Sequence, residues 1–276
     1  MIRRQDLGIL LLYYLGYSKV RNMVLCFKRM PVARFVTFHD IPAEGEANFR
    51  TNLRFLKERT NVVSLDDFFA GRLSWQRTNV VITFDDGYKS WISRALPALL
   101  DFGLPAVFFI SSGFVGLSDS KAAEFIRVRL GADPGTTSGL TEEDVRRMVA
   151  QGFTIGGHTC NHVNLAAMES KEEIHCEILQ DKRTLEAITG REVCYFAYPG
   201  GAHANQRLDL TGILRDSGYQ GAVTVVPGFN DHASPPYLLH RELTGVPMAP
   251  SVFKARVRGA SDGVAFLKQQ LTRFLG

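Results

Sequence analysis

Two short motifs supply side chains that can bind a metal ion and activate a water molecule. The first, TFDDG at positions 83–87, carries the carboxylates of Asp85 and Asp86, and the second, HTCNH at positions 158–162, carries two imidazoles. Residues 80–84 form an apolar run typical of a buried β-strand, so both aspartates fall where the strand gives way to a glycine turn. Adjacent side chains there can point in different directions, so one carboxylate can bind metal while the other stays free.

The two histidines lie four positions apart. On a helical turn, His158 and His162 would project from the same face and close on a single ion. With one aspartate they offer two nitrogens and one oxygen, and they leave an open position for water. An isolated Asp-Asp-Gly usually only caps a turn, and an isolated histidine is usually structural, but the two motifs together favour a hydrolytic metal centre. Cys160, between the histidines, is expected to pack rather than to bind the ion.

A third segment, FAYPGG at positions 196–201, follows these two motifs. In order and spacing, the three segments resemble those of the polysaccharide deacetylase family of carbohydrate esterases, the NodB homology family, over about residues 35–245. The resemblance implies that Asp85 is the catalytic base. It also implies one divalent metal ion, for which zinc is expected and cobalt, nickel or iron(II) would suit the same ligands. The implied ligands are Asp86, His158 and His162.

Amide hydrolysis is the reaction that the resemblance implies. Water on the metal ion would have its pKa lowered towards roughly 7, and Asp85 would activate it further for attack on an acetyl carbonyl. The metal ion and a backbone N–H of the turn at 198–200 would stabilise the resulting oxyanion, and we expect that N–H to belong to Gly200. Pro199 has no N–H to donate, so its expected role is to make the turn rigid.

Two further candidate residues come from the segment at 237–241. Many family members carry an arginine where this chain has Ala197, and we expect Arg241 to replace that cation beside Asp85. His240 fits the Leu-x-His motif in which the family keeps its catalytic histidine, so it is a candidate general acid for the leaving amine. His39, which follows the first predicted strand, is the alternative general acid.

Short apolar runs alternate with longer amphipathic segments along the chain. The apolar runs predict strands at 34–38, 79–84, 106–110, 154–155, 194–197, 221–225 and 237–240. The amphipathic segments predict helices at 47–59, 90–102, 141–151, 170–189 and 207–217. This alternation indicates an α/β protein with a mostly parallel sheet. The resemblance implies an irregular (β/α)7-type barrel, similar to a TIM barrel, with its site at the carboxyl ends of the strands.

The bulk composition suits one domain. A chain of 276 residues with 45% hydrophobic content can bury one sizeable core. We divide it into an N-terminal leader at 1–33, a deacetylase-like barrel at 34–245 and an amphipathic tail at 246–276 that packs back on the barrel. The four cysteines lack CxxC spacing, which favours free thiols and a reducing compartment. No basic and aromatic stripe accompanies the motifs, so no nucleic-acid partner is expected.

The leader is both basic and apolar. Residues 1–34 carry a net charge of +6, so the rest of the chain carries −2 of the total of +4. The uncharged run at 7–18 is shorter than the roughly 20 residues that span a bilayer. A helix here would suit peripheral association with an anionic membrane surface, and the alternatives are a helix packed on the barrel exterior and a signal peptide. We expect a cytoplasmic protein, peripheral on the inner face of the membrane, with export as the alternative.

Together these features predict a metal-dependent hydrolase that removes N-acetyl groups from amino sugars of the N-acetylglucosamine type, in a polysaccharide or a lipid-linked glycan. An O-acetyl esterase or a cyclic-amide hydrolase acting on a small molecule is the alternative among enzymes. A non-catalytic glycan-binding barrel is the alternative from a different class, although decay to such a protein would normally remove the base or a metal ligand. The sugar, its linkage, the native metal and the oligomeric state are left open.

Overall fold

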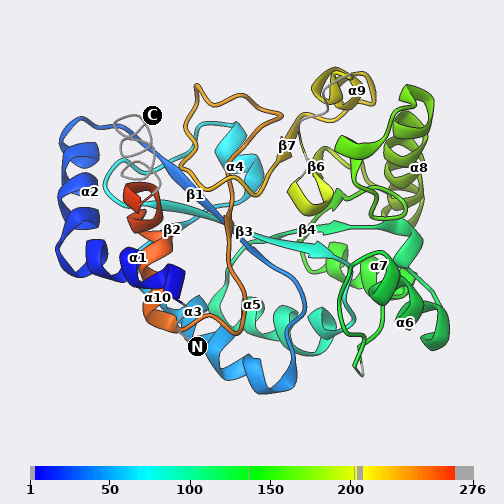
Figure 1. Cartoon of the computed structure of the whole chain (residues 1–276), viewed down its shortest axis with the longest axis horizontal. Coiled ribbons are helices and arrows are strands. Elements are labelled where there is room, and N and C mark those ends of the chain that lie inside the picture. Colours follow the sequence, from blue (N-terminus) through cyan, green and yellow to red (C-terminus); the bar gives the residue numbers. More distant parts are fainter. Residues whose placement is uncertain (1–3, 136, 202, 204–207, 265–276) are drawn as a thin grey trace.

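A parallel sheet organises the chain (Figure 1). The computed structural model describes residues 4–135, 137–201, 203 and 208–264. In this part of the chain the strand order is β7-β6-β5-β4-β3-β1-β8, and β2 pairs with the start of β3. The strands are β1 Ala33–Phe38, β2 Asn61–Val62, β3 Asn79–Asp86, β4 Val107–Ile110, β5 Thr154–Gly157, β6 Tyr195–Ala197, β7 Gly221–Val223 and β8 Glu242–Leu243.

The sheet curls into the predicted irregular barrel, because one segment spans the gap between its two edges. Leu239 forms a parallel bridge with Val223 of β7, and β8 pairs with β1 a few residues later. The strand predicted at 237–240 is therefore wrong in position, since the regular strand starts at Glu242. The strand begins later than predicted because a turn precedes it, in which the Leu238 N–H donates to the Pro235 carbonyl at 3.0 Å.

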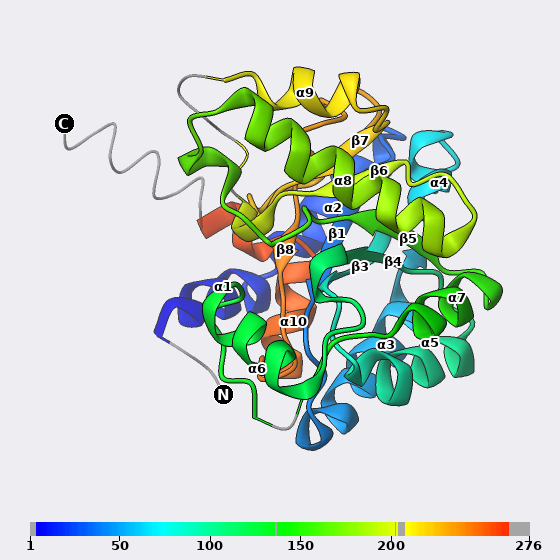
Figure 2. The same cartoon turned by 90° about the vertical axis from the view of Figure 1, so that its right-hand side faces the viewer.

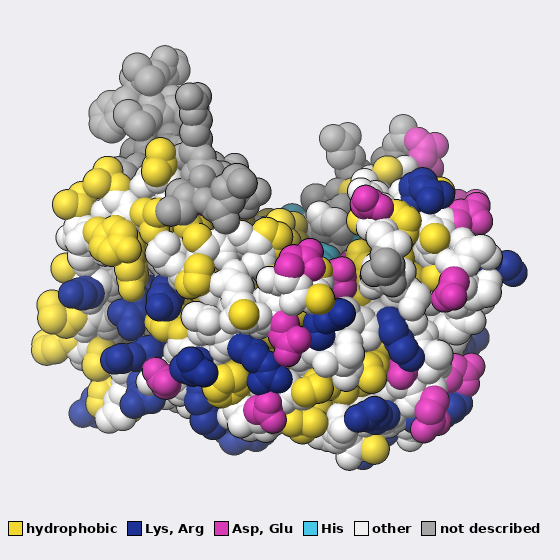
Figure 3. All heavy atoms as spheres, turned by 90° about the horizontal axis from the view of Figure 1, so that it is seen from below, with side chains coloured by type: hydrophobic (Ala, Val, Ile, Leu, Met, Phe, Trp, Pro, Cys, Tyr) yellow, Lys and Arg dark blue, Asp and Glu magenta, His cyan; other side chains and the backbone are white. Residues whose placement is uncertain are grey.

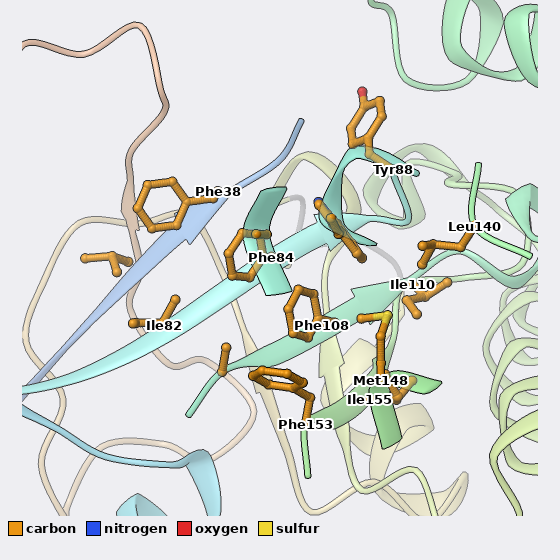
Figure 4. Close-up of a cluster of buried hydrophobic side chains, with 14 of the residues drawn as sticks. Phe38, Ile82, Phe84, Tyr88, Phe108, Ile110, Leu140, Met148, Phe153 and Ile155 are labelled. Carbon is orange, nitrogen blue, oxygen red and sulfur yellow. The ribbon is translucent and has the colours of Figure 1, made fainter. Parts of the chain in front are cut away.

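Side chains alternate between the two faces of the sheet, as a period of two requires. Barrel-interior residues form one apolar cluster, which includes Phe35, Val81 and Phe109. Their chain neighbours point outward into a larger cluster beneath the helices (Figure 4). There the rings of Phe84 and Phe108 stack with centroids 4.6 Å apart. Strands buried on both faces explain the continuous apolar runs of the sequence.

Helices cover the outside of the barrel (Figures 1 and 2). Helices α3 and α5 pack together, as do α7 and α8, and the latter pair also contacts β5. A five-residue π-helix, Trp91–Ala95, leads directly into α5. The helices of the barrel are α3 Glu46–Arg59, α4 Leu65–Phe69, α5 Leu96–Phe102, α6 Asp119–Val128, α7 Glu142–Ala150, α8 Lys171–Thr189, α9 Leu210–Asp216 and α10 Pro250–Val257.

Three of these helices and one strand are absent from the sequence-based prediction: α4, α6, α10 and β2. The helix α4 has five residues and β2 has two, so neither is long enough to establish a period. In the predicted tail, Phe253 and Val257 of α10 are buried, in agreement with packing on the barrel. The rest of the tail, from residue 265 onward, lies outside the described residues.

The leader forms two helices where the sequence predicted one. Helix α1 (Arg4–Tyr14) is followed by α2 (Tyr17–Phe27), and Gly16 between them has a φ of 87°, which a glycine adopts without strain. Helix α1 packs against α10, where Ile9 meets Ala255 and Ala260. Among the described residues, none of the helices combines the length and apolar character that crossing a bilayer requires.

A buried ionic network fixes the first of these helices, α1, to the barrel. Glu242 of β8 accepts hydrogen bonds from Arg34 of β1 at 3.2 Å and from Arg256 of α10 at 2.6 Å. Arg256 also donates to Asp6 of α1 at 3.0 Å. Arg34 donates to Asp262 at 2.7 Å as well, so each buried charge in the network faces an opposite one.

Candidate metal centre

The two motifs meet at the carboxyl end of neighbouring strands. The last two residues of β3 are Asp85 and Asp86, which lie in register with Phe109 and Ile110 of β4. The histidine motif directly follows β5, which pairs with the other edge of β4. Because all these strands are parallel, their ends lie on one rim of the barrel, which is where barrels of this kind place their sites.

Unusual backbone conformations are concentrated at this rim. Four non-glycine residues in the described part of the chain have positive φ, and three of them belong to the two motifs. The angles are 92° for Asp86, 61° for Thr159 and 50° for His162. Each such residue costs about 1–3 kcal/mol relative to a relaxed backbone and persists only where its surroundings hold it. Strain of this kind is typical of functional sites.

The histidine motif is a loop, so the expectation of a helical turn is wrong. The positive φ angles of Thr159 and His162 reverse the chain twice within five residues. The Thr159 hydroxyl accepts a hydrogen bond from the Val163 N–H at 3.1 Å and closes the loop. The two imidazoles nevertheless face the same side, with ring centroids 5.0 Å apart. A loop therefore achieves the convergence that the spacing suggested.

Asp86, His158 and His162 converge on one point. The Asp86 Oδ1 atom lies 3.4 Å from Nε2 of His158 and 3.4 Å from Nε2 of His162. Zinc bonds of about 2.0–2.1 Å in tetrahedral geometry place two ligand atoms about 3.4 Å apart. All three ligand atoms lie within 4.8 Å of one another, and Cys160 is not part of the group. The spacing thus fits a single divalent ion.

The hydrogen bonds of the two imidazoles also suit metal binding. Nδ1 of His158 lies 2.7 Å from the Ala197 carbonyl, and Nδ1 of His162 lies 3.0 Å from the Arg129 carbonyl. A carbonyl only accepts, so each Nδ1 carries the proton and each neutral ring presents the lone pair of Nε2 to Asp86. Two lone pairs and a carboxylate then face one another, an arrangement that a cation or an added proton must stabilise.

The ionisation of the two rings follows from this crowding. Burial lowers the pKa of His158, but the hydrogen bond with Asp86 and the charges of both aspartates outweigh it, so the pKa is raised. The pKa of His162 is lowered, first by burial and then by the neighbouring His158. An added proton is thus favoured on His158 and disfavoured on His162. A divalent ion supplies the same positive charge more effectively.

Asp85 is held apart from this group by a buried arginine. The Arg241 guanidinium donates to both carboxylate oxygens of Asp85, from Nη1 at 2.6 Å and from Nη2 at 2.7 Å. Its Nη1 also bonds the hydroxyl of Thr37 and its Nε bonds the Thr224 carbonyl, both at 2.7 Å. Both charged side chains are almost fully buried. Such a bidentate pair fixes the plane of the carboxylate.

The arginine decides the charge of Asp85. Burial alone would raise the pKa of this carboxyl group, but Arg241 and then His158 more than offset the burial, and the pKa falls from 3.8 to about 2. Asp85 is therefore ionised at every pH at which the protein would work. The predicted position of Arg241 beside Asp85, taken from the sequence, agrees with this geometry.

Asp181 of α8 supports the histidine loop, a role that the sequence analysis missed. This carboxylate accepts the backbone N–H of His158 and that of Ser112, each at 2.8 Å. It is fully buried, and burial raises its pKa to about 6 in spite of these hydrogen bonds. One helical turn earlier, Glu177 accepts the Asn161 N–H at 2.9 Å. The only available signal was a pair of acidic residues four apart on a helix predicted to be amphipathic.

The two glycines before His158 make room for these contacts. A Cβ on Gly157 would lie 2.9 Å from the Asp181 carboxylate and would collide with the Tyr219 hydroxyl. A Cβ on Gly156 would collide with the ring of Phe109. The missing side chains therefore let the backbone before His158 lie close to Asp181, Tyr219 and Phe109.

His240 does not lie with the other candidate residues. It is adjacent to Arg241 in an extended segment, so its side chain points to the opposite face. Its ring packs against Gly228, and its backbone exchanges two hydrogen bonds of 2.8 Å with the Asn230 side chain. His39, by contrast, lies close enough to lower the pKa of both Asp85 and Asp86 by its charge. The structure thus brings the alternative histidine to the site and places His240 away from it.

A turn and a polar pocket complete the rim. Gly200, with a φ of 60°, is exposed in the turn Pro199–Gly201 that directly follows β6 and Tyr198. On the opposite side, a polar pocket of about 400 Å³ is lined by Asp40, Lys89 and Arg94, among others. Tyr88 directly precedes Lys89 of this pocket, and burial, followed by the charges of Asp86 and Asp40, raises the pKa of its hydroxyl.

A family model described as polysaccharide deacetylase matches residues 75–222, which is more than half of the chain and includes both motifs. The chain belongs to the polysaccharide deacetylase family. The predicted family is therefore confirmed.

Two curated relatives show how far this similarity extends. YxkH of Bacillus subtilis, a protein assigned to the polysaccharide deacetylases, is 27% identical over 178 residues, which cover 64% of this chain and 56% of the relative. A chitooligosaccharide deacetylase of Bradyrhizobium is 27% identical over 148 residues, which cover 53% and 54%. The deacetylase thus spans about half the length of these relatives.

Solved structures share the fold. PplD, a deacetylase of Streptococcus pyogenes in complex with acetate, superposes with a TM-score of 0.65 at 19% identity, and the match covers 83% of this chain and 99% of PplD. IcaB of Ammonifex degensii gives a TM-score of 0.64 at 22% identity, over 83% and 97% of the two chains. These matches confirm the parallel α/β fold predicted from the alternation of strands and helices, and the irregular (β/α)7-type barrel that the resemblance implied.

Removal of the Arg241 guanidinium should raise the pKa of Asp85. In Arg241→Met, nothing offsets the effect of burial on the pKa of Asp85, so the acidic limb of kcat/KM should move to higher pH. Arg241→Lys keeps a positive charge and should move the limb less.

The wild-type pair of Arg241 and Asp85 stabilises the fold above about pH 4, and that contribution is lost as the pH falls towards 2. Denaturant unfolding at neutral pH should show a loss of about 3–5 kcal/mol in Arg241→Met. An unchanged acidic limb in a folded variant would refute this role.

Asp181→Asn should weaken metal binding although Asp181 is not one of the three proposed metal ligands. The amide keeps one acceptor but directs an N–H₂ group at a backbone N–H, so the His158 loop should shift and the affinity for zinc should fall about 10–100-fold. Competition with a chromogenic chelator measures this. Glu173→Gln, on the exposed side of the same helix, is the matched control and should bind zinc as the wild type does. Equal zinc affinity in all three proteins would contradict the support proposed for Asp181.

Proposed function

We propose that this deacetylase removes N-acetyl groups from amino sugars of the N-acetylglucosamine type, in a polysaccharide or a lipid-linked glycan, with the help of one divalent metal ion. One observation carries the proposal: two adjacent carboxylates have different partners. Asp86 faces two imidazoles, whereas Asp85 is bound to Arg241. A site that only binds glycans has no need for an ionised carboxylate held beside a set of metal ligands.

Asp86, His158 and His162 would hold the ion, and we propose that it is zinc, because two imidazoles and one carboxylate in tetrahedral spacing are a common zinc donor set. When bound, the ion would polarise the acetyl carbonyl and lower the pKa of a water molecule. The remaining steps belong to the residues of the chain.

Asp85 would accept the proton of the attacking water. Each of its oxygens uses one lone pair for Arg241 and keeps another, so the carboxylate can act as a base while its orientation stays fixed. The low pKa of about 2 makes Asp85 a weak base in the free protein. It therefore suits a water molecule that is already acidified, which is consistent with a metal-dependent reaction.

His39 would donate a proton to the nitrogen that leaves as the amine. The C–N bond of the amide breaks as this nitrogen is protonated, and acetate and a free amino sugar are formed. We choose His39 over His240 because His39 acts electrostatically on both aspartates, whereas His240 packs against Gly228 on the other face of its segment. The N–H of Gly200, in the turn after β6, is the proposed second partner of the oxyanion.

The pocket beside Tyr88 is a suitable place for neighbouring sugar units. Its lining is mostly polar and carries charges of both signs, including Asp40, Glu44 and Arg94. Sugar hydroxyls are both donors and acceptors, so such a lining can bind them through many directed hydrogen bonds. The pocket has room for more than the acetyl group, which favours a glycan chain over a small ester.

Metal dependence is the first test of this proposal. Incubation with a chelator should abolish acetate release from N-acetylglucosamine oligomers, and zinc or cobalt should restore it. Asp86→Ala should bind no zinc and should show no activity, whereas Asp85→Asn should bind zinc and still lose at least about 100-fold in kcat. Coupled enzymatic detection of acetate, with metal analysis of each protein, gives both values. Full activity of the metal-free protein would disprove the proposed role of the ion.

The choice of general acid is tested by comparing two histidines. His39→Ala should lower kcat by about 10²–10⁴-fold, because the leaving amine loses its proton donor. His240→Ala should lower kcat by less than about threefold, and its thermal unfolding shows whether the cavity beside Gly228 weakens the fold. A large loss of kcat in His240→Ala, with little change in His39→Ala, would reverse the assignment.

A further inference from the structure

The two N-terminal helices expose apolar side chains to solvent in regular stripes. On α1 the exposed positions Leu7, Leu11 and Tyr14 are spaced by three or four residues, with exposed Leu15 directly after the helix. On α2 the exposed positions Val20, Met23, Val24 and Phe27 repeat at the same spacing. Residues at this spacing lie on one face of a helix. Phe27 is 89% exposed, so nothing in the described part of the chain covers it. Each helix therefore has an apolar outer face, the reverse of the usual arrangement in a water-soluble protein.

The ionic network prevents these helices from turning their stripes inward. Asp6, on the inner face of α1, is buried and bonded to Arg256. Arg21, on the inner side of α2, lies over the ring of Phe229 at 4.0 Å and 3.5 Å from Asp262. The inner faces thus carry the charged and fixed groups, and the apolar stripes are held on the outside.

The apolar surface continues beyond the helices onto the barrel. Trp75 is exposed in the loop before β3, and the Arg29 guanidinium lies 5.3 Å from its ring centre. Met30, at the end of the leader, is exposed next to them and lines the same shallow cleft as Trp75. Residues distant in sequence therefore contribute to one surface. Figure 3 shows apolar side chains gathered at the end of the molecule that carries α1 and α2, with Lys and Arg side chains beside them.

The charged residues that the two helices contribute to this surface are basic. Lys19, Lys28 and Arg29 are exposed on or just after α2, and residues 7–30 contain no aspartate or glutamate. Basic residues that flank an apolar helix face, with tyrosine and tryptophan at its edges, fit the interface of a bilayer with anionic headgroups. A protein partner would bury such a surface as well, but nothing about it offers the mixed charges and shaped pockets of a protein interface.

We propose that the outer faces of α1 and α2, together with Trp75 and Met30, dock on the surface of an anionic lipid bilayer. The apolar stripes enter the interface between headgroups and acyl chains, and the basic side chains contact lipid phosphates. The barrel remains in water, and the Asp6–Arg256 and Arg21–Asp262 ion pairs fix α1 and α2 to it. This docking would hold the deacetylase close to membrane-linked glycans, but it does not depend on the proposed reaction.

Vesicle sedimentation with the full-length chain tests the proposal. The protein should sediment with phosphatidylcholine vesicles containing about one third phosphatidylglycerol, and much less with phosphatidylcholine alone. Met23→Ser/Phe27→Ser should lower the partition coefficient at least about tenfold by removing apolar contact. Lys19→Glu/Lys28→Glu should lower it by a similar factor, and added salt should weaken binding of the wild type.

A matched control removes exposed apolar side chains elsewhere. Val128 on α6 is 67% exposed and Met23 is 66% exposed, so Leu100→Ser/Val128→Ser removes comparable surface from the opposite part of the molecule. This variant should sediment as the wild type does. Circular dichroism and acetate release from soluble oligomers should be alike in all four proteins, which separates loss of docking from loss of folding.

Three outcomes would overturn the proposal. The first is absence of sedimentation of the wild type with anionic vesicles, and the second is equal loss in the control variant. The third is a stable dimer in solution that Met23→Ser/Phe27→Ser dissociates while lipid binding is absent, which would make a second copy of the chain the occupant of this surface.

Discussion

The buried ion pair between Asp85 and Arg241 is the constraint on which the site depends. Two charges in a barrel interior are costly unless each finds a complete set of partners. The Arg241 guanidinium meets this demand by bonding Asp85, Thr37 and the Thr224 carbonyl, and so it connects β3 and β1 to the turn after β7. The same contacts join β1 to the segment after β7, where the regular pairing between strands is short. The Arg241 guanidinium therefore both supports closure of the barrel and keeps Asp85 ionised beside the metal ligands.

The neighbouring residue connects this centre to the outside of the molecule. In the extended segment at 239–243, Arg241 points inward and Glu242 points outward, where it bonds Arg34 and Arg256. Through Arg256 and Asp6, that network fixes the N-terminal helix α1. The proposed catalytic carboxylate and the proposed membrane surface are thus held by adjacent residues on opposite faces of the same segment. Alternation along an extended chain is sufficient to explain how they are separated.

Backbone strain and buried acceptors position the metal ligands. The positive φ angles of Asp86 and His162 direct their side chains toward a common point, and Asp181 holds the His158 backbone from behind. The carbonyls of Ala197 and Arg129 select the tautomers that leave both Nε2 atoms free. These supporting groups come from β6, α6 and α8, so the centre is a product of the whole barrel rather than of the two motifs.

The sequence by itself determined the parts whose signals are local. The apolar runs and amphipathic segments gave most strands and helices, and the two motifs gave the cluster of Asp86, His158 and His162, because residue type and spacing restrict what a metal can bind. Elements of two or five residues, such as β2 and α4, were missed since a period needs more residues than they have. Only the tertiary structure decided that the histidine motif is a loop and that Asp181 supports it. It also decided that His39, rather than His240, lies close enough to the two aspartates to lower their pKa values. Each of these depends on contacts between segments far apart in the chain, or on the direction in which one residue of an extended segment points. In an extended segment, a shift of one position moves a side chain to the other face. The local sequence pattern does not show which of the two faces a given residue occupies.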